Sequence, residues 1–384
     1  MRCRFRPSLV PAPTTMPDDD DILREILLRL PPLPSSLPRA SLVSKRWLRL
    51  ISDPGFLRRF RAFHCRQPPP LLGIFQEDFF CPIFTPMLDP PDRIPTARLY
   101  LPLPRDERWD FRCCRHGLAL FFNHTHLEAT VWDPVTGDQR RVAFPSGFGN
   151  EDNDFVRNAA VLCGDGHAGC HRSRSFKLIL LRADDVLLDP NARAFASFYD
   201  SETDVWSGLI SASIKALIHM LRPSILVGNS ICWLLHGYGK SGILEFDLDR
   251  QSLAEISTPV GAHTSKLQIL RMENNGLGIA TLSDLSMQVW ERKVSSVSIA
   301  TWILQKTIQL DKLLSLRSPE ERAQAVILGY DEDGHAMFIR TTIGVFMIKL
   351  KSMEFKNLFE TNVLTTYHPY RTFYTTGNSS PLLA

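Results

Sequence analysis

No uncharged stretch of the chain is long and apolar enough to suggest a membrane span or the core of a secretion signal. The longest one, PSILVGNSICWLLHGYG at 223–239, is 17 residues long and contains Gly, Asn, Ser and His. It indicates two strands and a turn rather than a membrane helix. Residues 1–15 are rich in Arg and contain no acid, which is weakly similar to a transit peptide. We expect a disordered tail before a second start at Met16 instead.

The chain has eight Cys, but they follow no regular spacing. This pattern predicts reduced thiols in an intracellular protein, in the cytoplasm, the nucleus or both, rather than a disulfide framework. One local group, Cys163, His167, Cys170 and His171, combines residue types that bind metals, yet its spacing matches no common zinc module. We therefore predict no metal site.

Sequence signatures of catalysis are also missing. Neither H-E-x-x-H nor G-x-S-x-G occurs. GKS at 239–241 resembles the end of a P-loop, but Leu234 stands where that loop needs its first Gly, and GLGIAT at 276–281 lacks the third Gly of a dinucleotide loop. The acidic DEDG at 331–334 is typical of a turn. No cofactor and no catalytic residue is predicted.

The net charge of +3 hides an uneven distribution of charge. Residues 1–70 contain 13 Lys or Arg and 6 Asp or Glu, so the rest of the chain is slightly acidic. Eight of these bases lie within 37–66, which raises the hypothesis of nucleic-acid binding through residues 39–66. However, the helix expected at 43–51 carries Trp47, Leu48 and Ile51 and has no Asn or Gln with which to read adenine.

The spacing of apolar residues predicts three or four short helices before residue 67. Leu23, Ile26, Leu27 and Leu30 form one helical face, which Pro31 ends. Later faces are expected from Leu37, Ala40 and Val43, from Val43, Trp47 and Ile51, and from Phe56, Leu57, Phe60 and Phe63. QPPP at 67–70 predicts a stiff linker. So small a unit buries too little surface to be stable alone, and a partner is implied.

The order of these residues resembles an F-box of the plant type. The shared pattern runs from E-I-L-x-R-L-P to S-L-x-R-[AC]-S-x-V-[CS]-[KR]-x-W. The matching positions are Glu25, Ile26, Leu27, Arg29, Leu30, Pro31, Leu37, Arg39, Ala40, Ser41, Val43, Ser44, Lys45 and Trp47. Met16 stands where Leu is usual. The resemblance implies a small three-helix F-box at 16–66 that docks onto the Skp-type adaptor of a Skp–cullin–F-box ubiquitin ligase.

Seven matching positions are expected to face that adaptor. They are Pro17, Ile26, Leu30, Pro31, Leu37, Val43 and Trp47. For each of them the alternative interpretation is a place in the internal core of the F-box.

Residues 71–384 show an internal repeat. A strand, a polar turn and a second strand recur around Asp133, Asp200, Asp247, Glu291 and Lys349. The steps between these positions are about 44–67 residues. A second hairpin precedes most copies, as in CCRHGLALFF and AVILGYDEDGHAMFI. Four strands per repeat of this length predict a β-propeller. With LLGIF and ARLYLPLP as further strands, we expect about six blades, or seven if the chain ends share one.

This half resembles the F-box-associated, kelch-like propeller region of grass F-box proteins, on segments such as GLAL…VWDPVTG and ILGYDEDGHAMFI. The expected fold is therefore a small α module followed by an all-β propeller at 71–384. The resemblance implies a non-catalytic substrate receptor, whose F-box binds the adaptor and whose propeller binds a target protein. A propeller enzyme with an accessory helical module is the alternative, and nucleic-acid binding is the third hypothesis.

Overall fold

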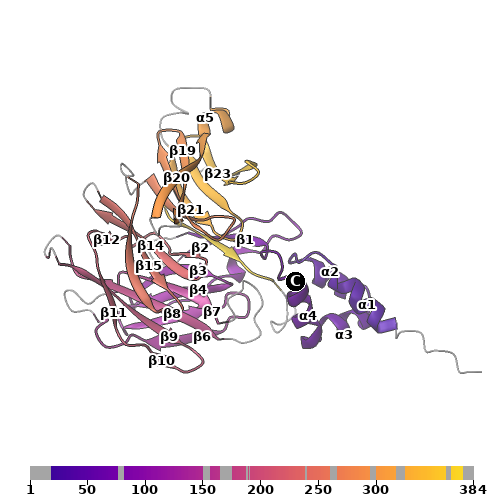
Figure 1. The fold of residues 1–384 in the computed structure, drawn as a ribbon. Coiled ribbons are helices and arrows are strands. Elements are labelled where there is room, and N and C mark those ends of the chain that lie inside the picture. Colours follow the sequence, from indigo (N-terminus) through magenta and orange to yellow (C-terminus); the bar gives the residue numbers. More distant parts are fainter. Residues whose placement is uncertain are drawn as a thin grey trace, which may run out of the picture.

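A computed structural model describes the chain at residues 19–76, 82–149, 156–164, 175–186, 189, 191–237, 240–259, 266–294, 300–316, 325–359 and 365–374. It shows a helical module followed by a propeller of six blades, and the two lie side by side in Figure 1. The tail expected at 1–15 and the candidate residue Pro17 fall outside the described residues.

Four helices form the helical module. They are α1 (Asp19–Leu28), α2 (Ser36–Ser41), α3 (Lys45–Ile51) and α4 (Pro54–His64). Side chains cap two of the starts, since Ser44 accepts a hydrogen bond from the Trp47 amide and Asp53 accepts one from the Phe56 amide. The spacing had predicted three or four helices, whereas the F-box resemblance implied three. All four form, and Phe56 and Phe60 on α4 are both buried in the module's core.

Blade 1 joins the two ends of the propeller. Its strands are β1 (Leu71–Gln76), β2 (Ile83–Pro86) and β25 (Tyr367–Arg371), in the order β2-β1-β25. The ends therefore share a blade, but the total is six and not seven. The prediction of a strand at ARLYLPLP is wrong, because only a short 3-10 turn, η1 (Thr96–Arg98), forms there. Pro102 and Pro104 lack amide hydrogens, so this segment is poorly suited to a sheet.

Blades 2 to 6 follow the repeat along the chain, each as an antiparallel sheet. Blade 2 consists of β3 (Trp109–Arg115), β4 (Leu118–Asn123), β5 (Glu128–Trp132) and β6 (Gln139–Ala143). Blade 3 consists of β7 (Asn158–Cys163), β8 (Phe176–Ala183), β9 (Arg193–Asp200), β10 (Val205–Trp206) and β11 (Ile210–Ser213). Blade 4 consists of β12 (Leu217–Ile218), β13 (Ile225–Val227), β14 (Ser230–Gly237), β15 (Lys240–Asp247) and β16 (Ser252–Ser257).

Blade 5 consists of β17 (Leu267–Arg271), β18 (Leu277–Ser283), β19 (Ser286–Val294) and β20 (Ala300–Gln309), followed by the short helix α5 (Leu310–Leu313). Blade 6 consists of β21 (Val326–Asp331), β22 (Ala336–Thr341), β23 (Gly344–Lys349) and β24 (Phe355–Phe359). The five positions that revealed the repeat lie in or directly after β5, β9, β15, β19 and β23, one strand in each of these blades. These positions are Asp133, Asp200, Asp247, Glu291 and Lys349.

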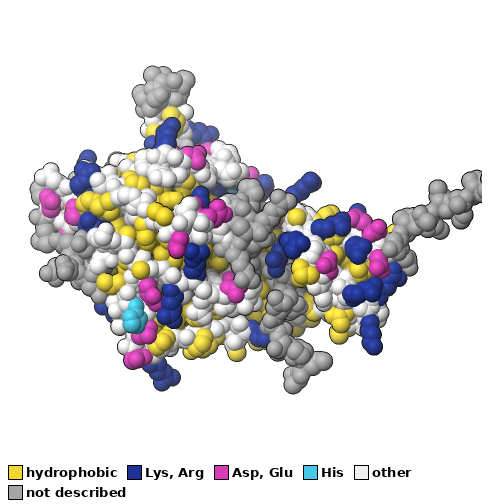
Figure 2. All heavy atoms as spheres, turned by 90° about the horizontal axis from the view of Figure 1, so that it is seen from below, with side chains coloured by type: hydrophobic (Ala, Val, Ile, Leu, Met, Phe, Trp, Pro, Cys, Tyr) yellow, Lys and Arg dark blue, Asp and Glu magenta, His cyan; other side chains and the backbone are white. Residues whose placement is uncertain are grey.

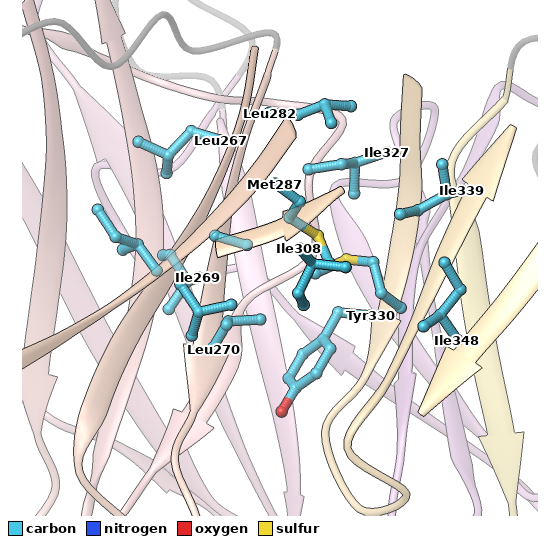
Figure 3. Close-up of a cluster of buried hydrophobic side chains, with 14 of the residues drawn as sticks. Leu267, Ile269, Leu270, Leu282, Met287, Ile308, Ile327, Tyr330, Ile339 and Ile348 are labelled. Carbon is cyan, nitrogen blue, oxygen red and sulfur yellow. The ribbon is translucent and has the colours of Figure 1, made fainter. Parts of the chain in front are cut away.

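The core lies between the blades, where aliphatic and aromatic faces of neighbouring sheets meet. Figure 3 shows part of it, with Ile269 of blade 5 facing Ile339 and Ile348 of blade 6 across Met287 and Ile308. A blade has two apolar faces, so a single sheet cannot bury both and only the closed ring does. All six blades are therefore needed to bury the apolar faces of the propeller.

The inner strands of all blades run in the same direction. Hydrogen bonds connect the same ends of neighbouring inner strands. The Cys163 amide at the end of β7 donates to His116 after β3, and the Tyr330 hydroxyl near the end of β21 donates to the Arg271 carbonyl at the end of β17. The carboxyl ends of β3, β17, β21 and β25 consequently meet at one face of the propeller, which we call the mouth.

Candidate functional site

The core of the helical module uses one side of each helix. Its buried apolar residues are Leu23, Leu27, Leu28, Leu37, Ala40, Leu50, Ile51, Phe56 and Phe60. Leu28 takes the inward place on α1 that the sequence pattern gave to Ile26, whose side chain is 54% exposed. The apolar face of α1 is therefore rotated relative to the prediction, and Ile26 is left on the surface.

Large apolar side chains are exposed on the helical module beside this core. They are Ile22, Ile26, Leu42, Val43, Leu48 and Phe63. Ile22 and Ile26 are one helical turn apart and share a face of α1. Leu42 and Val43, 82% and 62% exposed, lie in the connection between α2 and α3. Because α2 ends at Ser41, Val43 does not continue the buried face of Leu37 and Ala40, as the spacing had suggested.

The structure divides the predicted adaptor-facing residues into three groups. Ile26, Pro31 and Val43 are exposed, whereas Leu30 and Trp47 are half-buried against the module's core. Leu37 is only 4% exposed, so it is a core residue in this chain and offers no docking surface. Leu37 packs inward because α2 has a single turn and a half and presents Leu37 and Ala40 on its one inner face. Leu42 and Leu48 are exposed apolar residues that the sequence analysis did not select.

The basic residues of the module surround these apolar side chains. Figure 2 shows hydrophobic side chains among Lys and Arg side chains across the module. Some of the bases pair with acids of α1: Arg46 Nε lies 2.5 Å from Asp20 Oδ1, and Arg29 and Arg59 reach Glu25 at 2.9 and 3.3 Å. The hydrogen bond from Arg46 lowers the pKa of Asp20. The face is consequently apolar with a largely cationic rim.

Contacts with the propeller hold the module near blades 1 and 2. The Ser35 amide donates to Asp92 Oδ1 at 2.9 Å, and Arg371 Nη1 donates to the carbonyl of Pro69 in the linker. Burial lowers the pKa of Arg61 on α4, and the nearby Asp133 opposes this effect. Arg371 and Asp133 both lie at the mouth face, so the module sits on that side of the ring.

A cluster of ion pairs fills the mouth, and we call it the mouth cluster: Arg115, Arg271, Arg371, Asp331, Glu332 and Asp333. Three successive acids at the end of β21 and directly after it each pair with an Arg that ends the inner strand of another blade. Arg371 binds Asp331 with two guanidinium nitrogens at 2.6–2.9 Å, Arg115 Nε lies 2.6 Å from Glu332, and Arg271 lies 2.9 Å from Asp333. The turn of blade 6 thereby reaches blades 1, 2 and 5.

Residues of blade 4 form hydrogen bonds with the mouth cluster. Glu332 accepts a hydrogen bond from the Leu226 amide at 2.9 Å, and Arg115 donates to the hydroxyl and carbonyl of Ser224. Burial disfavours the charged forms, yet Arg115 and the hydrogen bonds lower the pKa of Glu332. Burial and the charge of Glu332 raise the pKa of Asp333, which Arg271 opposes. The cluster is arranged to hold blades together.

The mouth cluster bears on the enzyme hypothesis, which requires carboxylates that converge at the mouth. Carboxylates do converge there, but all three are engaged by Arg side chains and backbone amides. A general acid or base needs an oxygen that is available to substrate. The cavity between these residues is about 40 Å³, the space of very few water molecules.

Sequence analysis missed the ion pairs of the mouth cluster, since DEDG was interpreted as a turn. The turn does exist, with the Gly334 amide bonded to Asp331 Oδ1. A weak signal was present in the sequence, since Arg115 and Arg271 follow the strand segments FRCC and LQIL, whereas Arg371 follows the less apolar YHPY. Of the candidate metal ligands, Cys163 is buried on β7, and His167, Cys170 and His171 lie outside the described residues. No cluster of metal-binding side chains occurs in the part of the chain that is described.

A helical module with this exposed face, joined to a six-bladed propeller, defines the class of F-box proteins with a propeller domain. The F-box domain model matches residues 16–59. The model described as "F-box protein AT5G49610-like, beta-propeller" matches residues 110–373, and the chain belongs to this family. A search of curated proteins found no match.

Solved propellers are similar to the chain at a low level. The Dos1 propeller is 11% identical with a TM-score of 0.38, over 66% of this chain and 60% of that one. The periplasmic gluconolactonase PpgL of Pseudomonas aeruginosa is 12% identical with a TM-score of 0.38, over 75% of this chain and 80% of that one. Likeness of this degree does not indicate a shared activity. None of the described helices has the length and apolar character needed to cross a bilayer.

Proposed function

We propose that this chain is the target-recognition subunit of a Skp–cullin–F-box ubiquitin ligase, with the helical module bound to a Skp-type adaptor and the propeller bound to a target protein. The observation that carries the proposal is the exposed apolar face of a module that matches the F-box domain. An exposed group of large apolar side chains with a polar rim is typical of an interaction site. Such a complex would work in the cytoplasm or nucleus.

The propeller supports a receptor rather than a catalyst. The mouth cluster is internally paired, so its charges serve the closure of the ring. In the proposed complex the chain contributes no reacting group. It raises the rate of ubiquitin transfer by holding the target near the transfer machinery, which is catalysis by proximity. The plant type and the kelch-like character of the propeller remain part of this proposal.

The adaptor site is proposed to consist of Ile26, Val43 and Pro31, with Leu30 and Trp47 at its margin. The residues Leu42 and Leu48 extend it. Leu37 is left out because it is buried. Pro17, which precedes α1, is retained from the family pattern alone.

The test is co-purification of the full-length chain with a Skp-type adaptor. Ile26→Asp and Val43→Asp place an unpaired carboxylate in the contact, which desolvation strongly disfavours, and each should weaken binding at least about tenfold. Both side chains are exposed, so the fold should be retained. Leu209→Asp, at a 50% exposed residue of the propeller, is the matched control. Adaptor binding that is absent in the wild-type chain, or unaffected by both variants, contradicts the proposal.

A further inference from the structure

Blade 5 has a longer outer hairpin than its neighbour, blade 6, and a groove lies between these two blades. The strands β19 and β20 have nine and ten residues, whereas β23 and β24 of blade 6 have six and five. The groove lies between the two blades beside the carboxyl end of β17, and its lining includes Met272 and Val289 of blade 5 and Leu350 of blade 6. The groove there has a volume of about 390 Å³, within the ~300–1,000 Å³ typical of ligand pockets.

The floor of the groove is apolar. It is formed by Leu270, Val289 and Tyr330, with Met272 and Leu350 at its edges. Figure 3 shows Leu270 and Tyr330 at one margin of the cluster, with the Tyr330 hydroxyl pointing away from the aliphatic side chains. That hydroxyl donates to the Arg271 carbonyl at 3.0 Å, so the ring is fixed in place. The floor is a rigid surface for a large apolar side chain.

The wall formed by β20 continues this surface toward solvent. Val289 is opposite Lys306 and Glu291 is opposite Ile303 in the β19–β20 ladder, so these four residues share one face. Ile303 is 43% exposed on that face. An extended peptide lying along β20 would therefore meet apolar surface beyond the groove itself.

Most charges of the groove are neutralised by neighbours, but one is not. Arg271 is paired with Asp333, and Glu291 accepts from Asn274 at 2.8 Å and lies 3.3 Å from Lys293. Lys306 donates one hydrogen bond, to the Leu350 carbonyl at 3.0 Å, and has no carboxylate partner among the described residues. An ammonium group has three donors, so two remain for a ligand. The positive charge of Lys306 is therefore not balanced by a carboxylate of the groove.

We propose that this groove binds a short extended segment of the target protein, with a large apolar side chain on the floor and a neighbouring Asp or Glu on Lys306. The segment is acidic because the uncompensated charge of the groove is positive, and short because the groove is small. The inference rests on the proposed function, since it names the class of target that the propeller recognises.

The experiment pans a phage-displayed library of random linear peptides on the full-length chain bound to its adaptor. Enriched peptides should carry Asp or Glu next to a large apolar residue. Lys306→Glu should weaken their binding about tenfold or more and shift a fresh selection toward Lys and Arg. Gln305→Trp, at an exposed residue of the same wall, should fill the groove and compete with all of them.

Lys266→Glu is the matched control, because it reverses an exposed charge of the same blade at the opposite end of β17. It should leave peptide binding unchanged. Peptides without acidic residues, or peptides that bind the Lys306→Glu and Gln305→Trp variants as well as the wild type, overturn the inference. The inference is also overturned if the selection enriches no peptide although the adaptor is bound. That result does not contradict the proposed function, because adaptor binding is then intact.

Discussion

At the scale of single residues, burial sets the charge state of a histidine in the propeller. His219 lies where the inner strand of blade 4 is interrupted between β12 and β13. The Asn158 side chain donates to the carbonyls of His219 and Arg222 at 2.8 and 2.9 Å, which fixes this segment against blade 3. Burial, then the nearby Arg222 and His236, lower the pKa of His219 to about 4. The folded protein therefore holds this imidazole neutral.

The depressed pKa of His219 predicts that stability is lost as the pH falls. The unfolded chain binds a proton at His219 below about pH 6.5, whereas the folded chain does so only near pH 4, so acid favours unfolding across this interval. Between pH 7 and pH 5 this residue should reduce the free energy of unfolding by about 2 kcal/mol. Urea unfolding at the two pH values, compared between the wild type and His219→Gln, measures the difference.

The variant His236→Gln is the control for the neighbouring ring. The pKa of His236 is also lowered by burial, but this side chain is the less buried of the two, so its removal should change the pH dependence less. A His219→Gln chain that loses as much stability between pH 7 and pH 5 as the wild type would show that other groups cause the loss.

The docking residues show what residue spacing could and could not predict. The F-box pattern selected Ile26 and Val43 from residue order alone, and both side chains are exposed in the structure. It could not separate them from Leu37, since all three are apolar residues of one short sequence pattern. That separation depends on the ends of α2 and the rotation of α1, which tertiary packing decides.

At the scale of elements, side-chain caps hold the starts of two helices of the helical module, α3 and α4. α4 provides Phe56 and Phe60 to the core, and its start is held by Asp53, whose Oδ2 accepts from the Phe56 amide at 2.9 Å. A helix of this length is marginal by itself. The position of α4 therefore depends on both the cap and the packing of its two phenylalanines.

Asp53→Ala should destabilise α4 by about 1 kcal/mol, because the first amides of the helix lose their acceptor. Hydrogen exchange of the amides of residues 57–64 in the full chain measures the local free energy of opening and should show roughly fivefold faster exchange. Asp21→Ala is the control, since Asp21 is exposed and forms only a surface pair with Arg24. Equal exchange of α4 in the wild type and Asp53→Ala would contradict the role of the cap.

The strands also show what sequence patterns could and could not predict. Alternating residues and turn chemistry predicted the hairpins of blades 2 to 6, which are present. ARLYLPLP also alternates, and Leu99 and Leu101 are indeed buried, yet the segment pairs with no strand of the described chain. Alternation of apolar and polar residues indicates that one side of a segment is buried. A strand also needs backbone amide donors for pairing, and the prolines of this segment lack them.

At the scale of the whole molecule, the ring is closed by contacts between residues far apart in sequence. Blade 1 joins β1 to β25 across nearly the whole propeller, and the mouth cluster pairs Arg115 with Glu332 across 217 positions. Sequence periodicity reports neighbours within a repeat, so it predicted blades but not these pairs. The sequence does place an Arg at the end of three inner strands. However, these Arg residues can be assigned to ion pairs only once the order of the blades around the ring is known.

The mouth cluster should be a major determinant of the stability of the ring. Glu332→Gln removes the charge that neutralises Arg115, whose side chain is only 4% exposed, and leaves a buried cation with a weaker partner. The expected loss is about 3–5 kcal/mol in the free energy of unfolding, the range for breaking one side of a buried ion pair. Thermal unfolding of the full chain, followed by its tryptophan fluorescence, measures it; six of the seven Trp lie in the propeller.

The double variant Arg115→Met with Glu332→Leu separates the ion pair from the shape of the site. Replacing both charges by apolar groups avoids the uncompensated cation, so most of the lost stability should return. The Leu226 amide then lacks its acceptor, which limits the recovery. Glu354→Gln, which breaks a pair with Lys349 on the surface of blade 6, is the matched control and should cost less than about 1 kcal/mol. If Glu332→Gln is no more destabilising than this control, the ring is held by its apolar faces and not by the mouth cluster.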